Sequence, residues 1–201
     1  MTRNVVAALV LLAGAGTLSA QTAGLCFRGQ PAARCRAFLI TEFGVNGSTH
    51  DNFVDATSAV WELGLMKNTG SRSAFGGSAR FAVGAGDRLI LSPRLRRWMS
   101  HGLTLDVAPG VIVWDDRVTG LSQAQAPGFS GQVTLGYQDL IGVAAGIEIA
   151  HFERSGVGGL SGTSAVPFVG ARLGSYPGTI AGTAGAALIG LVAMILHSSN
   201  Y

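Results

Sequence analysis

Apolar and polar residues alternate along most of the chain from Ala37 onward, and this two-residue period is typical of β-strands with one apolar and one polar face. The period is clearest from Phe129 to Gln138, where Phe, Gly, Val, Leu and Tyr occupy one face and Ser, Gln, Thr, Gly and Gln the other. Aromatic residues stand near both ends of the apolar face. A membrane-spanning strand needs this pattern, because its apolar side chains face lipid and its aromatic rings lie at the two interfaces.

Eight segments carry the period, and most reach the roughly 9 to 11 residues that a tilted strand needs to cross a bilayer. We therefore predict an all-β fold, an antiparallel up-and-down transmembrane β-barrel of about eight strands. The predicted strands cover approximately residues 37–47, 53–67, 74–86, 88–99, 102–115, 128–139, 141–152 and 165–175.

The composition favours membrane residence over a soluble fold. Apolar residues make up 48% of the chain and charged residues only 12%, against a usual charged fraction of about 25%. The formal net charge is +3 and the basic residues are scattered, so the sequence makes no case for a nucleic-acid partner.

Connection lengths agree with an outer-membrane barrel, in which periplasmic turns are short and external loops are longer. If the first strand starts in the periplasm, the predicted connections at residues 69–73, 100–101 and about 140 are periplasmic, and all are short. The two longest predicted connections, residues 116–127 and 153–164, then lie on the external side.

The same alternation predicts charged side chains on the inner face of the barrel, four acidic and four basic. Isolated charges in a narrow lumen are costly, so the two signs should pair. Because side chains fill the interior of an eight-stranded barrel, we expect a plugged lumen. The alternative is that the strand phase is wrong in places and that several of these charges lie in loops. The predicted lumen charge network consists of Glu42, Glu62, Asp106, Glu148, Arg80, Arg94, Arg96 and Arg172.

The N-terminal region predicts export. Residues 1–20 have a basic start, an apolar run of about 12 residues and a small-residue end, which together are typical of a secretory signal peptide. An uncleaved anchor is the alternative. Residues 21–36 form an N-terminal segment that contains both cysteines, and in an exported chain we expect a Cys26–Cys35 disulfide. Two thiols without a nearby His supply too few ligands for a metal site.

The C-terminal region departs from the strand pattern. Residues 178–196 are uncharged and mostly apolar, which predicts a helix that follows a β-barrel domain of residues 37–175. This helix could anchor a periplasmic β-domain in the inner membrane, or it could pack on or in the barrel. The segment could also form two further strands broken near Gly190.

These features together resemble the small bacterial outer-membrane β-barrel proteins of the eight-stranded class. The resemblance covers about residues 37–175, and residues 38–44 look like a first barrel strand. It implies an outer-membrane location and the lipid bilayer as a partner, with lipopolysaccharide or envelope proteins as further candidates. Members of the class include anchors, adhesins and lipid-modifying enzymes, so the fold does not imply one function.

Three short stretches carry candidate chemistry. Residues 197–200, His-Ser-Ser-Asn, look like the His-x-Ser-Asn stretch of outer-membrane lipid A deacylases, but no acidic residue follows them to orient the His. His151 and Glu153 share a strand face beside Arg154, where a rim ion pair is the simpler interpretation. Arg97 should lie on the outer face near an interface, close to Trp98, as an anchor at the lipid headgroups.

The sequence therefore predicts a monomeric, non-enzymatic outer-membrane barrel with a plugged lumen, no cofactor and no metal, which acts structurally or through its loops. The alternatives are a membrane-embedded lipid hydrolase and a periplasmic β-domain tethered to the inner membrane by residues 178–196.

Overall fold

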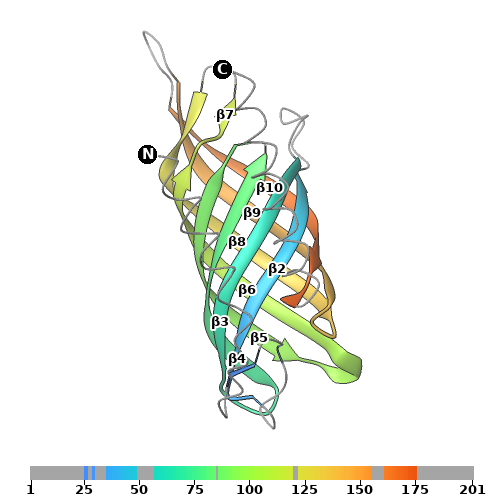
Figure 1. Cartoon of the computed structure of the whole chain (residues 1–201). Helices are drawn as coiled ribbons and strands as arrows, with labels where there is room; N and C mark the ends of the chain where they lie inside the picture. The colour runs from blue at the N-terminus through green and yellow to red at the C-terminus, as the bar shows by residue number, and fades with distance from the viewer. Residues whose placement is uncertain are drawn as a thin grey trace, which may run out of the picture.

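A computed structural model shows eight long antiparallel strands that close into a barrel (Figure 1), so the predicted all-β barrel is confirmed. The structure describes residues 25–26, 29, 35–48, 57–84, 86–119, 122–154 and 161–175. The predicted signal peptide, the predicted helix at 178–196 and the stretch at 197–200 lie outside the described residues. Within the described part of the chain, no helix has the length and apolar character needed to cross a membrane.

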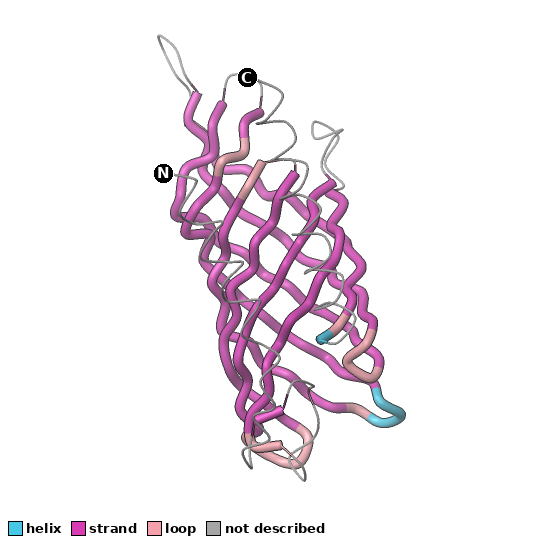
Figure 2. Tube along the Cα trace, in the orientation of Figure 1, coloured by secondary structure: helices cyan, strands magenta, loops and turns pink. Residues whose placement is uncertain are grey.

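Each long strand pairs with the next along the chain, and β10 pairs with β2 to close the ring (Figure 2). Two short strands add to this ring: β1 (Leu25–Cys26) runs parallel to the start of β2, and β7 (Val118–Thr119) pairs with β8. The short 3-10 turn η2 (Ser100–Gly102) connects β5 to β6. The barrel strands are β2 (Ala37–Ser48), β3 (Thr57–Asn68), β4 (Ser73–Gly84), β5 (Arg88–Trp98), β6 (Leu103–Asp115), β8 (Ser122–Tyr137), β9 (Ile141–Arg154) and β10 (Gly162–Leu173).

The two ends of the barrel differ in their connections. At one end, which we call the turn end, tight turns at residues 69–72, 99–102 and 138–140 join the strands. Gln138 and Asp139 both have positive φ values, 52° and 55°, and Asp is one of the few residues with a side chain that tolerates this conformation. We call the opposite end, where β2, β4, β6 and β9 finish, the loop end.

Two predicted connections are longer than those in the structure. The stretch expected as a loop at residues 116–127 instead contains β7 and the first part of β8, which pairs with β9 from Ser122↔Arg154 to Gln125↔His151. Residues 122–127 are Ser, Gln, Ala and Pro, so they lack the large apolar residues that make the strand period visible. Backbone pairing with neighbouring strands extends the strand where side-chain hydropathy does not indicate it. The connection expected at 153–164 likewise shortens to residues 155–161.

Burial alternates along the strands and places apolar side chains on the outside. On β8, Phe129, Val133, Leu135 and Tyr137 are exposed, whereas the polar residues between them point inward and are buried. Other strands repeat this arrangement, with Phe75, Leu95, Val107, Val143 and Ile147 among the exposed side chains. A soluble barrel has the opposite distribution, because an exposed apolar surface this extensive is unfavourable in water.

A small apolar core lies inside the barrel at the turn end. Phe38, Met66, Ala74 and Trp98 are buried there together with Ile40, and the Phe38 and Trp98 rings meet edge to face at 5.7 Å between their centroids. Cys26 packs against this cluster. Arg97 is exposed on the outer face, as predicted, whereas strand alternation turns the neighbouring Trp98 side chain into the lumen.

Closure between β2 and β10 leaves no room for a side chain at Gly44. A Cβ there would lie 2.1 Å from the Ala171 carbonyl oxygen, whereas a Cβ at Gly47 on the same strand would meet its nearest atom only at 4.0 Å. We expect Gly44→Val to destabilise the folded barrel by about 1–3 kcal/mol and Gly47→Val to change its stability by less than ~0.5 kcal/mol. Urea titration of the refolded chain in detergent measures the difference. Equal stability of the two variants would contradict the seam geometry.

Candidate functional site

The structure places all eight residues of the predicted lumen charge network inside the barrel, where each is buried. It also buries four charged residues that the sequence analysis did not include, namely Arg88, Asp115, Arg117 and Asp139. The described lumen therefore holds six carboxylates and six guanidinium groups, which balance in formal charge.

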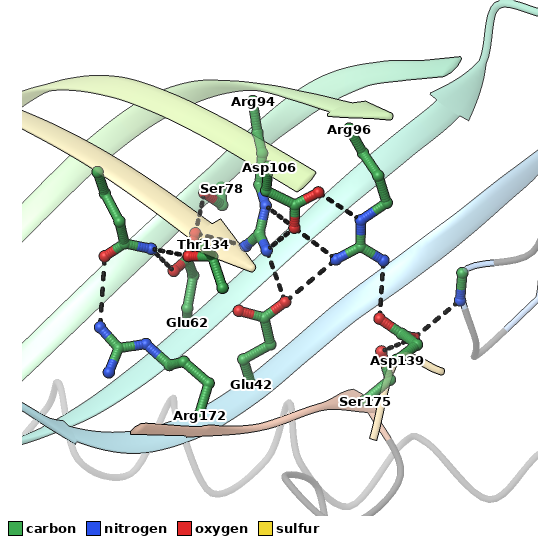
Figure 3. Close-up of polar contacts among 12 residues, drawn as sticks. Glu42, Glu62, Ser78, Arg94, Arg96, Asp106, Thr134, Asp139, Arg172 and Ser175 are labelled. Atoms are coloured by element: carbon green, nitrogen blue, oxygen red, sulfur yellow. Dashed lines mark hydrogen bonds and ion pairs between the residues drawn. The ribbon is translucent and has the colours of Figure 1, made fainter. Parts of the chain in front are cut away.

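Arg94 on β5 is the centre of the network (Figure 3) and is 1% exposed. Its Nη1 donates to Glu62 Oε1 at 2.9 Å and its Nη2 to Glu42 Oε1 at 2.6 Å. Its Nε donates to Asp106 Oδ2 at 3.2 Å, and Nη2 also contacts this oxygen. One guanidinium thus joins carboxylates from β2, β3 and β6, on both sides of the lumen.

Arg96 lies two residues further along β5 and extends the network toward the turn end. It forms a bidentate pair with Asp106, with Nε to Oδ1 and Nη2 to Oδ2 both at 2.7 Å. Its Nη1 donates to Asp139 Oδ1 at 2.7 Å, and its guanidinium lies 5.4 Å from the centroid of the Phe38 ring. Arg96 therefore connects the charged middle of the lumen to the apolar core at the turn end.

A second cluster surrounds Glu148 toward the loop end. Glu148 Oε2 lies 2.8 Å from Arg88 Nε and 3.0 Å from Arg117 Nη1, and Oε1 lies 3.5 Å from Arg80 Nη2. Arg117 follows β6 and turns back into the barrel, where Asp115 accepts its Nη2 donor at 2.5 Å. Burial lowers the pKa of the Arg117 guanidinium, but its hydrogen bonds to Asp115 and the charge of Glu148 raise the pKa above its usual value overall.

Polar side chains of β8 bridge the two clusters. Gln132 accepts from Arg80 Nη1 through Oε1, and the same oxygen accepts from Arg172 Nη2 at 3.3 Å. Ser130 Oγ accepts from Arg80 Nη2 at 2.6 Å. Arg172 differs from the other predicted members because no described carboxylate oxygen lies within 4 Å of it, so it joins the network through Gln132 (Figure 3).

Asp139 accepts hydrogen bonds from residues near both ends of the described chain and so links them to the network. Besides Arg96, its Oδ2 accepts from the Gly29 backbone N–H at 3.0 Å and from Ser175 Oγ at 2.8 Å. The Ser175 carbonyl in turn accepts from Thr41 Oγ1 at 2.7 Å. Gly29 lies in the segment closed by the Cys26–Cys35 disulfide, whose prediction is confirmed. Gly29 itself lies at the turn end, close enough that a Cβ there would meet Arg96 and Phe38.

The four buried charged residues outside the predicted network were missed for different reasons. Arg88 has the same strand parity as Arg94 and Arg96, so the alternation could have found it. Asp115 changes parity relative to Asp106, because both Val113 and Trp114 are exposed near the register shift between β5 and β6. Arg117 and Asp139 lie in connections, where no strand period applies.

A small cavity lies between some of these side chains. This cavity of about 20 Å³ at the turn end, lined by Glu42, Arg96, Asp106 and Arg172 among others, has room for about one water molecule. No cluster of three or more His, Cys, Asp or Glu side chains in the described residues could hold a metal ion. The arrangement neutralises charge and fills space.

His151 and Glu153 share the outer face at the loop end, as predicted from alternation. His151 Nδ1 lies 3.5 Å from Thr163 Oγ1, and Glu153 accepts from Gln125 Nε2. The side chain of Arg154, their predicted ion-pair partner, lies outside the described residues.

Comparison with known proteins finds no match among family models, curated proteins or solved structures.

Removing Arg94 should destabilise the barrel strongly, because Glu42, Glu62 and Asp106 would lose a shared buried partner. We expect Arg94→Met to cost about 3–5 kcal/mol of folding free energy. Arg97→Met is the matched control on the same strand, since Arg97 is exposed on the outer face, and it should cost less than ~1 kcal/mol. Equilibrium unfolding in detergent compares the two variants. A loss at Arg94 no larger than the loss at Arg97 would refute the central role of this guanidinium.

Proposed function

We propose that the chain is a non-enzymatic integral protein of the bacterial outer membrane with a plugged lumen and a structural or interaction role through its loops. The observation that carries the proposal is the distribution of polarity, with paired charges inside the barrel and apolar side chains outside it. Membrane barrels have this distribution because lipid surrounds them.

Barrel closure supports membrane residence. In a bilayer every backbone N–H and C=O group needs a partner within the protein, and a closed barrel provides one without exposing a sheet edge. Pairing of β10 with β2 over Phe168↔Ser48 to Leu173↔Phe43 closes this ring. The exposed aromatic residues also fit the two interfaces, with Phe75 and Tyr137 toward the turn end and Trp114 toward the loop end.

The lumen geometry argues against a diffusion pore. Arg94 reaches carboxylates on three other strands, and the cavity near it holds about one water molecule. Barrels that conduct solutes freely have about 16 to 18 strands and leave a wide aqueous channel. With the lumen filled, the surfaces left to act are the lipid-facing wall and the connections at the loop end. The bilayer is the first partner, and lipopolysaccharide or envelope proteins are partners that the loops could contact from a monomeric barrel.

The alternative functions have less support. A lipid hydrolase would need His151 and Glu153 to act on one nucleophile, but His151 Nδ1 lies 3.5 Å from Thr163 Oγ1, whereas Glu153 accepts from Gln125. The other catalytic candidates, at residues 197–200, lie outside the described residues. A soluble periplasmic β-domain would have to keep side chains such as Phe129, 64% exposed, in contact with water.

Conductance in planar bilayers tests the plug. We expect no discrete conductance steps from the refolded wild-type chain. The charge-balanced variant Glu42→Ala/Arg94→Ala/Arg96→Ala/Asp106→Ala should open steps, because it empties the lumen where these four side chains fill it. Both samples are first checked for a folded barrel by their heat-dependent migration on gels. Steps from the wild-type chain at the same frequency as from the variant would overturn the proposed plug.

A further inference from the structure

Among the described side chains, the charged ones that are not buried lie at opposite ends of the barrel according to their sign. The acidic ones, Asp87, Asp116 and Glu153, all lie at the loop end. The basic ones whose side chains are described lie at the turn end, and they are Arg36, Lys67, Arg72 and Arg97; Arg154, which ends β9 at the loop end, has no described side chain. Among the side chains that the structure describes, none of these four cations forms an ion pair with a carboxylate.

The four cations form a continuous arc across β2 to β5, which lie side by side in the barrel (Figure 1). The Arg36 carbonyl accepts from the Asn68 N–H at 2.9 Å, which places Arg36 beside the strand end that carries Lys67. The Arg72 carbonyl accepts from the Trp98 N–H at 2.9 Å, which places Arg72 beside Arg97 in the same way. We call these four residues the basic arc.

An apolar surface adjoins the basic arc on the outer wall of the barrel. Lys67 pairs across the sheet with Phe75, and Phe75 pairs with Leu95. Phe75 is 54% exposed and Leu95 is 51% exposed. A row of cations therefore borders exposed apolar side chains on the same strands.

We propose that the basic arc binds the phosphate headgroups of anionic phospholipids. This inference rests on the proposed membrane location. A phospholipid matches both parts of the surface, because its phosphate meets the cations while its acyl chains cover Phe75 and Leu95. Lys and Arg suit this position, since their long stems lie along apolar surface while their charged ends reach the headgroups. A free anion would match the cations alone and leave the adjoining apolar surface uncovered.

The acidic residues at the loop end favour one orientation of the barrel in a membrane that contains anionic lipid. Asp87 and Asp116 lie next to each other at the loop end, where the Asp116 N–H donates to the Asp87 carbonyl at 2.8 Å. Acidic side chains repel anionic headgroups, so this rim disfavours the lipids that the basic arc attracts. The barrel should therefore be oriented with its turn end in the leaflet that contains anionic phospholipid.

Spin-labelled lipids test this proposal on the full chain refolded into phosphatidylcholine vesicles. Electron paramagnetic resonance resolves the motionally restricted lipids at the protein surface and gives the association of labelled phosphatidylglycerol relative to labelled phosphatidylcholine. Each cation near an anionic surface strengthens lipid association by about fivefold. The measured value averages over all lipids around the barrel, of which the basic arc contacts only some. We therefore expect the association constant of phosphatidylglycerol to exceed that of phosphatidylcholine by at least about twofold. The preference should disappear in Lys67→Gln/Arg72→Gln/Arg97→Gln and at about 1 M NaCl, where charges are screened within ~3 Å.

The matched control Asp116→Asn/Glu153→Gln changes charge at the other rim and should retain the preference. If the triple variant does not refold, the salt series on the wild-type chain still decides the outcome. The lipid site would be overturned if the wild-type chain showed no preference for phosphatidylglycerol. It would also be overturned if the preference survived both the triple substitution and high salt. An acidic protein partner would then fit the basic arc better. The motionally restricted fraction of spin-labelled phosphatidylcholine reports insertion of the barrel independently of headgroup charge. Its absence would refute the membrane proposal together with the lipid site, whereas its presence without headgroup selectivity would refute the lipid site alone.

Discussion

The contact of Arg94 with Glu42, Glu62 and Asp106 is the interaction on which the rest of the structure depends. Each of these groups is buried, and a buried charge without a partner costs several kcal/mol. The four side chains come from β2, β3, β5 and β6, so they satisfy one another only when the barrel is closed in this register. A shift of one strand by one residue would turn its charges to the outside and its apolar residues into the lumen.

The chemistry of arginine explains why one group can serve three carboxylates. A guanidinium presents five N–H donors in a rigid plane, whereas an ammonium group is a compact and strongly hydrated charge. All six buried cations in the described lumen are Arg, and the one described Lys, Lys67, is exposed. Arg96 uses the same planar group to reach Asp106 and Asp139 while it lies over Phe38, and it thereby joins the charge network to the apolar core.

Strand alternation was sufficient to predict the barrel and the burial of eight of the twelve charged residues in the described lumen, because a single period governs both faces of a strand. It predicted the direction of Arg80, Arg94 and Arg96 from parity alone. It could not predict Arg117 and Asp139, since both lie in connections whose backbone path depends on contacts distant in sequence. The early start of β8 was missed for a related reason, because residues 122–127 pair through their backbone and carry no large apolar side chains.

We propose that lipid contacts the outer wall of the barrel, and tryptophan fluorescence measures this contact. Trp61 lies on the outer face between Phe43 and Phe81, whereas Trp98 is buried in the lumen. Two double variants each retain one of these indoles: Trp98→Phe/Trp114→Phe keeps Trp61, and Trp61→Phe/Trp114→Phe keeps Trp98. Each variant is inserted into vesicles whose lipids carry bromine on their acyl chains, and the quenching of its fluorescence is measured. If lipid covers the outer wall, brominated lipid should quench Trp61 strongly and Trp98 little. Quenching of Trp61 by aqueous iodide but not by brominated lipid would contradict it.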